Sequence, residues 1–200
     1  ADVLGMMGRA LLAPGDEVIV PLPAFGMYAL SAADAGATVV EVPHRDYALD
    51  LDGVLAALTP RTRIAYVANP NNPTGAVIAY EVLRAFADRL PASVLLVLDE
   101  AYVDFARDDG LDLVRRYENV MSLRTLSKGY SLAGLRLGFG IAQPRVAAML
   151  NKVKDSYAVD AVACEVGAAA FEDQDYKDAC AAKVRASREK LSAGLAGLGL

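Results

Sequence analysis

The stretch Ser93–Tyr102, which reads SVLLVLDEAY, decides the fold class of this chain of 200 residues. Its apolar run predicts a β-strand that is buried on both faces, as in a parallel sheet covered by helices. Asp99 ends the run, and a carboxylate at the end of a buried strand is costly unless it meets a cation or several hydrogen-bond donors. The stretch therefore predicts a central strand with a polar position at its carboxyl end.

Short β-branched runs alternate with helix-like stretches on both sides of this strand. The alternation is typical of an α/β fold with a three-layer α-β-α architecture and a mostly parallel sheet. The predicted strands are Glu17–Pro21, Thr38–Val42, Arg63–Ala68, Ser93–Leu98, Val120–Leu123 and Leu137–Ala142, and the predicted helices among them are Val3–Ala13, Phe25–Ala35, Asp52–Leu58 and Ile78–Leu90. From Pro144 onward the sequence predicts long helices without a clear strand.

The composition excludes several classes of function. Hydrophobic residues make up 54% of the chain and the formal net charge is −5, which favours a folded core and argues against a nucleic-acid partner. The apolar runs are too short to cross a bilayer and no signal peptide is visible, so we expect a cytoplasmic protein without a membrane partner. Cys164 and Cys180 suit neither a disulfide framework nor a zinc site, and no metal is expected. His44, the only histidine, has a loop-like context and is not expected to be catalytic.

Three polar clusters follow predicted strands: Asn69–Gly75, Asp99–Tyr102 and Thr125–Lys128. Open α/β sheets bind ligands at the carboxyl ends of their strands, so the coincidence predicts a shared site. Each cluster also has a plainer interpretation. The first is a rigid turn, the acid of the second caps a turn, and the third is a polar loop with a surface lysine.

Lys128 has a distinctive chemical neighbourhood. Thr125 and Ser127 place hydroxyl groups beside it, and Arg136 follows eight residues later. Hydroxyls and a guanidinium can hold a phosphate group next to an amine that forms an imine.

The ordered set Asn72-Pro73-Thr74-Gly75, Asp99-x-x-Tyr102, Ser127-Lys128 and Arg136 resembles the fold-type I aminotransferases, which use pyridoxal 5′-phosphate (PLP). The resemblance runs from Ala1 to at least Asn151. The finer pattern is similar to the histidinol-phosphate aminotransferase branch of that family. That finer pattern comprises Pro23–Tyr28, Asn71–Gly75, Asp99–Tyr102, Arg124–Lys128 and Leu132–Gly138.

The resemblance implies a role for each matching residue. Lys128 would carry PLP as a Schiff base and move a proton between the substrate Cα and the cofactor C4′. Asp99 would pair with the pyridine nitrogen, which keeps the ring an electron sink. Asn72 and Tyr102 would hydrogen-bond the ring's phenolic oxygen. The catalytic residues implied are therefore Lys128, Asp99 and Tyr102.

The remaining implied contacts bind the cofactor without taking part in proton transfer. Phe25 would lie against the face of the ring, because an aromatic side chain stacks on a flat heterocycle. The phosphate would be held by Thr125, Ser127 and Arg136.

The activity implied is that of a PLP-dependent transaminase. It passes an amino group between glutamate/2-oxoglutarate and a substrate such as histidinol phosphate/imidazole acetol phosphate. Three alternatives stay open: an aromatic amino-acid aminotransferase, an enzyme like threonine-phosphate decarboxylase, and a non-catalytic module or inactive excerpt that keeps the fold. The partners implied are a small-molecule amino donor and an oxo-acid acceptor.

The resemblance also implies a domain organisation. Residues 1–150 would form the central part of a PLP-binding large domain, and residues 151–200 would be linking helices that lead toward a small C-terminal domain. A homodimer is expected for the full-length protein. Because the chain begins inside the first predicted helix, we expect an excerpt that lacks the family's N-terminal arm and substrate-carboxylate clamp.

Overall fold

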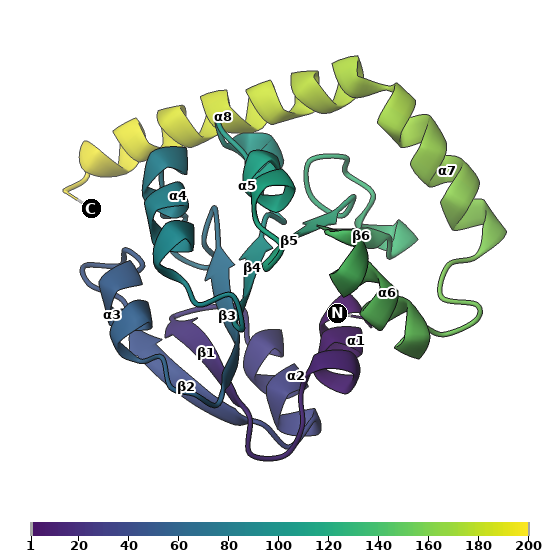
Figure 1. The fold of residues 1–200 in the computed structure, drawn as a ribbon. Helices are drawn as coiled ribbons and strands as arrows, with labels where there is room; N and C mark the ends of the chain where they lie inside the picture. The colour runs from purple at the N-terminus through teal and green to yellow at the C-terminus, as the bar shows by residue number, and fades with distance from the viewer. Residues whose placement is uncertain (1, 200) are drawn as a thin grey trace.

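The apolar run that ends at Asp99 forms strand β4 (Leu95–Asp99) inside a six-stranded sheet (Figure 1). The computed structural model describes residues 2–199, and the strand order is β2-β1-β3-β4-β5-β6. Every neighbouring pair is parallel except β5 and β6, which are antiparallel. The other strands are β1 (Glu17–Leu22), β2 (Thr38–Pro43), β3 (Thr62–Ala68), β5 (Val120–Thr125) and β6 (Gly138–Ala142). The predicted three-layer α/β fold with a mostly parallel sheet is confirmed.

The helices follow the predicted pattern with small shifts at their ends. They are α1 (Asp2–Leu11), α2 (Met27–Asp34), α3 (Leu51–Ala56), α4 (Tyr80–Arg89), α6 (Pro144–Val153), α7 (Ala161–Glu172) and α8 (Gln174–Ala196). Helix α5 (Leu111–Arg116) and two short 3₁₀ segments, η1 (Val103–Phe105) and η2 (Ala133–Leu135), were not predicted. The two 3₁₀ segments have three residues each and are too short to show a full apolar period in the sequence.

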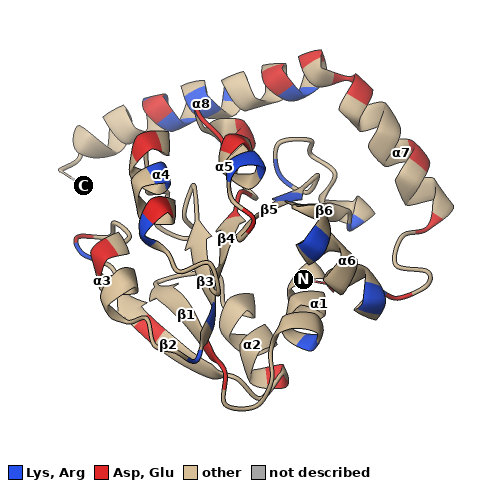
Figure 2. Ribbon diagram, viewed as in Figure 1, with Lys and Arg blue, Asp and Glu red and all other residues tan. Residues whose placement is uncertain are grey.

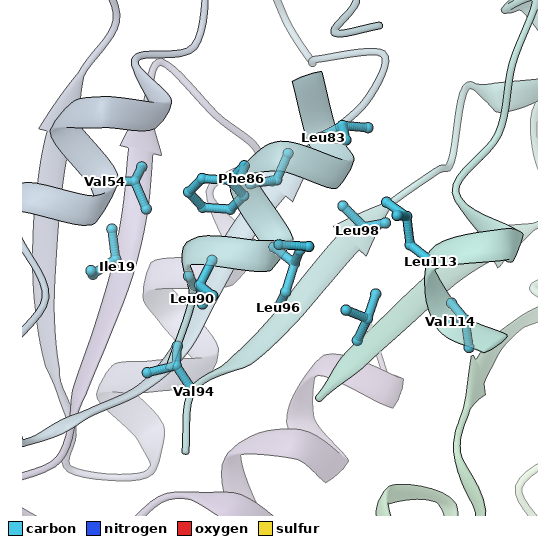
Figure 3. Packing of buried hydrophobic residues seen from close by; sticks show 14 of the residues in the cluster. Ile19, Val54, Leu83, Phe86, Leu90, Val94, Leu96, Leu98, Leu113 and Val114 are labelled. Carbon is cyan, nitrogen blue, oxygen red and sulfur yellow. The ribbon is translucent and has the colours of Figure 1, made fainter. Parts of the chain in front are cut away.

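Alternate residues of β4 pack on opposite faces of the sheet. Leu96 and Leu98 belong to a cluster with residues of α3, α4 and α5, among them Phe86 (Figure 3). Leu95 and Val97 belong to a second cluster with residues of α1, α2 and α6. Because side chains alternate along a strand, helices on both faces require an unbroken apolar run, as the sequence shows.

Helices α7 and α8 form the outer rim of the molecule in Figure 1, and α8 packs against η1. Most side chains of α8 are exposed, and the helix carries basic and acidic residues along its length, whereas the strands carry few charges (Figure 2). Among residues 2–199, the helices lack the combination of length and apolar composition needed to cross a lipid bilayer.

Helix α4 provides a test of how the sheet is covered. Leu83 is 2% exposed and packs in the cluster of Figure 3, while its neighbour Val82 is 52% exposed. We expect Leu83→Ala to lower the free energy of unfolding by about 3 kcal/mol, because it leaves a cavity in the core. Val82→Ala is the matched control and should change it by less than about 0.5 kcal/mol. Urea unfolding followed by circular dichroism measures both, and equal effects would contradict the assigned burial.

Candidate active site

The loops that follow β3, β4 and β5 meet at one edge of the sheet. The backbone N–H of Asn69 donates to the carbonyl of Asp99 over 2.9 Å, and that of Glu100 donates to the carbonyl of Leu123 over 2.8 Å. Strand β1 lies between β2 and β3, so the connection from β1 runs to one side of the sheet while the strands from β3 onward extend to the other. Such a switch point is where open α/β sheets bind ligands, so the predicted clusters share one edge.

Asp99 is partly buried and is held by two hydrogen-bond donors. Its Oδ1 accepts from the backbone N–H of Ala101 at 3.0 Å, and its Oδ2 accepts from the hydroxyl of Tyr28 at 2.5 Å. Burial raises the pKa of Asp99 above its ordinary value, and the two hydrogen bonds oppose that rise. A carboxylate fixed in this way can pair with a cationic ligand group.

Tyr28 is a site residue whose contact with Asp99 the sequence did not reveal. Its side chain is only 1% exposed, and its ring stacks on that of Tyr66 with the centroids 4.4 Å apart. Burial and the charge of Asp99 both raise the pKa of Tyr28, so the phenol remains a neutral donor. Because 71 positions separate the two residues, their contact depends on how α2 packs against the sheet that contains β4.

Phe25 lies between β1 and α2, next to this tyrosine pair. Its ring meets that of Tyr28 edge-on, with the centroids 5.7 Å apart. Phe25 is 40% exposed, so much of its surface is free to contact a flat ligand.

Lys128 is exposed, in a compact loop after β5. Its ammonium lies 5.1 Å from the centroid of the Tyr102 ring, which brings together the clusters that follow β4 and β5. The backbone N–H of Ser131 donates to the Lys128 carbonyl, and that of Leu132 donates to the Leu126 carbonyl, both over 3.0 Å. The lysine therefore has a fixed backbone, and within residues 2–199 its exposed amine makes no hydrogen bond or ion pair.

Thr125 and Ser127 place their hydroxyl oxygens 2.9 Å apart, beside the lysine. The Thr125 oxygen also accepts from the backbone N–H of Ser127. Arg136 has a left-handed backbone with φ of 58° and donates from its guanidinium to the Ala133 carbonyl at 2.7 Å. The hydrogen bonds of residues 2–199 join the two hydroxyls to each other, but they do not join Arg136 to them.

Asn72 lies partly exposed in the turn after β3, and its neighbour Asn71 fixes that turn. The Asn71 amide donates to the Pro23 carbonyl at 3.2 Å and to the Thr74 hydroxyl at 2.9 Å. Gly75 has a φ of 71°, which a side chain would disfavour, and its N–H donates to the Asn71 carbonyl. The turn is thereby attached to the loop that carries Phe25.

Glu100 forms a second buried contact that sequence reasoning missed. It is 3% exposed and accepts from the backbone N–H of Gly110 and the hydroxyl of Ser122, each at 2.5 Å. Arg124 donates to the same carboxylate at 2.9 Å. These bonds join the segment after β4 to β5. In the sequence, their only signal is that Glu100 and Arg124, an acid and a base, both lie at the ends of predicted strands.

His44 and the cysteines lie apart from these contacts. Burial lowers the pKa of His44, which follows the edge strand β2. Cys164 is exposed in α7 and Cys180 is half-buried in α8.

The fold described above is shared with solved aminotransferases. A solved histidinol-phosphate aminotransferase from Sinorhizobium meliloti, in complex with pyridoxal-5′-phosphate, superposes with a TM-score of 0.93 and 34% identity over 99% of this chain and 55% of that one. A Thermus thermophilus aspartate aminotransferase mutant superposes with a TM-score of 0.85 and 32% identity over 98% of this chain and 55% of that one.

Sequence comparison specifies the family. Residues 2–200 match the model of the aminotransferase class I and II family, and the chain belongs to that family. Among curated relatives, histidinol-phosphate aminotransferase 2 of Ralstonia nicotianae is 45% identical over 100% of this chain and 54% of its own length. Histidinol-phosphate aminotransferase 1 of a Nostoc species is 46% identical over 99% of this chain and 55% of its own length. The chain spans about half the length of the curated relatives it matches.

The hydrogen bond between Tyr28 and Asp99 can be tested by titration. Tyr28→Phe keeps the stacked ring but removes a donor to the carboxylate, so the pKa of Asp99 should rise further from its ordinary value. Tyr66→Phe removes the hydroxyl of the ring stacked on Tyr28 and should leave that pKa nearly unchanged. Carbon-13 NMR of the Asp99 carboxyl group measures both. Equal shifts in the two variants would show that the bond does not control the carboxylate.

Proposed function

We propose that this chain is the cofactor-binding part of a PLP-dependent aminotransferase that exchanges an amino group between histidinol phosphate and 2-oxoglutarate. The observation that carries the proposal is the meeting, at one sheet edge, of a free lysine amine with the side chains that follow the neighbouring strand. Lys128 approaches the ring of Tyr102, and Tyr102 follows the hydrogen-bonded carboxylate of Asp99 by three residues.

The donor set fits PLP in its chemistry. The cofactor has an aldehyde, a basic ring nitrogen, a phenolic oxygen and a phosphate, and when bound it supplies an electron sink for the substrate's Cα electrons. Lys128 offers an amine for the aldehyde, and Asp99 offers a carboxylate for the protonated nitrogen. Thr125 and Ser127 offer adjacent hydroxyls for the phosphate.

The proposed roles are those that the family resemblance implies, and the exposure and contacts of the residues support them. Lys128 would hold the cofactor through its exposed amine and would then serve as the base and acid that moves the proton of the substrate Cα. Asp99 stabilises the positive charge on the ring nitrogen. Tyr102 and Asn72 hydrogen-bond the phenolic oxygen, and Phe25 covers one face of the ring.

Arg136 completes the proposed phosphate site only if its guanidinium turns away from the Ala133 carbonyl. That bond lies at an exposed position, so exchanging it for bonds to a phosphate costs little. Arg136 has a left-handed backbone and lies directly after η2, two residues before β6 begins.

The choice of substrate rests on the relatives, since both curated histidinol-phosphate aminotransferases described above exceed 40% identity along the chain. The proposal includes residues 1–150 as the central part of the large domain and residues 151–200 as linking helices toward a small domain. It further includes a homodimer in the cytoplasm, with PLP as the resident cofactor.

The role of Lys128 is tested by spectroscopy of the full-length protein. Wild type mixed with PLP should show a visible or near-ultraviolet band that survives dialysis, and Lys128→Ala should lack it. Transamination should fall by about 100-fold or more, because the residue that moves the proton is lost. Lys152→Ala, which removes an exposed lysine of α6, is the matched control and should keep the band. Identical spectra for wild type and Lys128→Ala would refute the assignment.

Substrate profiling separates the proposed reaction from its alternatives. In the full-length protein, kcat/KM with histidinol phosphate and 2-oxoglutarate should exceed kcat/KM with phenylalanine or tyrosine as amino donor. Coupled detection of glutamate measures these rates. The reverse order would identify an aromatic aminotransferase, and release of carbon dioxide from threonine phosphate would identify a decarboxylase.

A further inference from the structure

Gly129, directly after Lys128, lies against the side chain of Asp104. The glycine is buried, and a Cβ added to it would overlap the carboxylate, Cγ and Cβ of Asp104. Asp104 belongs to η1, only two residues after Tyr102. The segment that follows β4 therefore supports the lysine loop through a close backbone contact that only glycine permits at this position.

Tyr130, the next residue, is held from the other side by α7 and α8. Its ring meets that of Phe171 edge-on with the centroids 5.3 Å apart, and its hydroxyl lies 3.2 Å from the side-chain amide of Gln174. The ammonium of Lys177 lies 5.8 Å from the centroid of the same ring. Two consecutive residues after Lys128 are thus fixed by elements that lie outside the proposed cofactor contacts.

Asp104 is half-buried among groups of both charges. Burial raises the pKa of its carboxyl group, while Lys177, Arg124 and the backbone N–H of Gly129 oppose the rise and Asp178 adds to it. Its backbone carbonyl accepts from the guanidinium of Arg185, also in α8, at 3.3 Å. Helix α8 therefore contacts the backbone of Asp104 through Arg185. Its Lys177 pairs with Asp178 at 3.0 Å and adds positive charge near the Asp104 carboxylate.

We propose that Asp104 is a positioning residue for Lys128. It braces the backbone of Gly129 and is itself held by Arg185 of α8, with the positive charge of Lys177 from the same helix nearby. The inference rests on the proposed function of Lys128 and extends it, because it makes the docking of α8 a condition for presenting the amine. Asp104 has no contact with the cofactor in this proposal and acts only through the loop.

The electrostatic part of the proposal is tested with the full-length protein and PLP. Asp104→Asn should weaken PLP affinity by about tenfold, because the carboxylate packed against Gly129 loses its charge and with it the attraction of Lys177 and Arg124. The circular dichroism of the visible band, per bound cofactor, should also fall, since it reports how rigidly the lysine-bound cofactor is oriented. Lys177→Gln should shift both readouts in the same direction by less. Asp108→Asn removes an exposed charge from the same segment and should match wild type.

The contact itself is tested by a double-mutant cycle. Gly129→Ala should impair PLP binding strongly, because its methyl group overlaps Asp104. Asp104→Gly removes that overlap, so adding Gly129→Ala to Asp104→Gly should cost about tenfold less in affinity than adding it to wild type.

Two outcomes would overturn the inference alone. In the first, the effects of Asp104→Gly and Gly129→Ala on affinity are additive. In the second, Asp104→Asn and Lys177→Gln both match Asp108→Asn in affinity and in circular dichroism, while Lys128→Ala still abolishes the band. A band that persists in Lys128→Ala would instead refute the proposed function.

Discussion

The parallel pairing of β3, β4 and β5 is the constraint on which the rest of this structure depends. In its register Ala68 pairs with Asp99 and Asp99 pairs with Leu123, so three strands end within a residue or two of one another. Parallel strands need helical crossovers, and those helices bury both faces of the sheet. The carboxyl ends of the strands are then where polar side chains can gather without being buried away from hydrogen-bond partners. A one-residue slip of β4 would turn Asp99 from the face of α2 to that of α5.

The covering helices contribute to the site as well as to the core. Tyr28 packs in the cluster beneath α1, α2 and α6, and the same side chain donates to Asp99. Stacking on Tyr66 fixes the ring, and the ring fixes the direction of its hydroxyl. Packing in the core thereby sets the orientation of a carboxylate at the surface of the sheet, which is how a rigid scaffold can hold a ligand group in a defined geometry.

Much of the fold could be predicted from the sequence because it depends on local patterns. The run before Asp99 identified the central strand, and the turn residues after β3 and β5 placed Asn72 and Lys128 at strand ends. Contacts between distant segments could not be predicted in this way. The bonds of Tyr28 to Asp99 and of Arg124 to Glu100 depend on strand order and register, which no short window contains. Helix α5 was missed, and it buries only Leu113 and Val114, which are adjacent in the sequence and show no helical spacing.

Asp99 and Glu100 are adjacent carboxylates that have different hydrogen-bond partners in the fold. Successive side chains of a strand point to opposite faces, so Asp99 meets Tyr28 while Glu100 meets Ser122 and Arg124. Arg124 neutralises Glu100 inside the protein, and Glu100 therefore does not compete for a cationic ligand. The donors to Asp99 are a phenol and a backbone amide, both neutral. Neutral donors orient a carboxylate without cancelling its charge, so Asp99, unlike Glu100, has no ion-pair partner among residues 2–199.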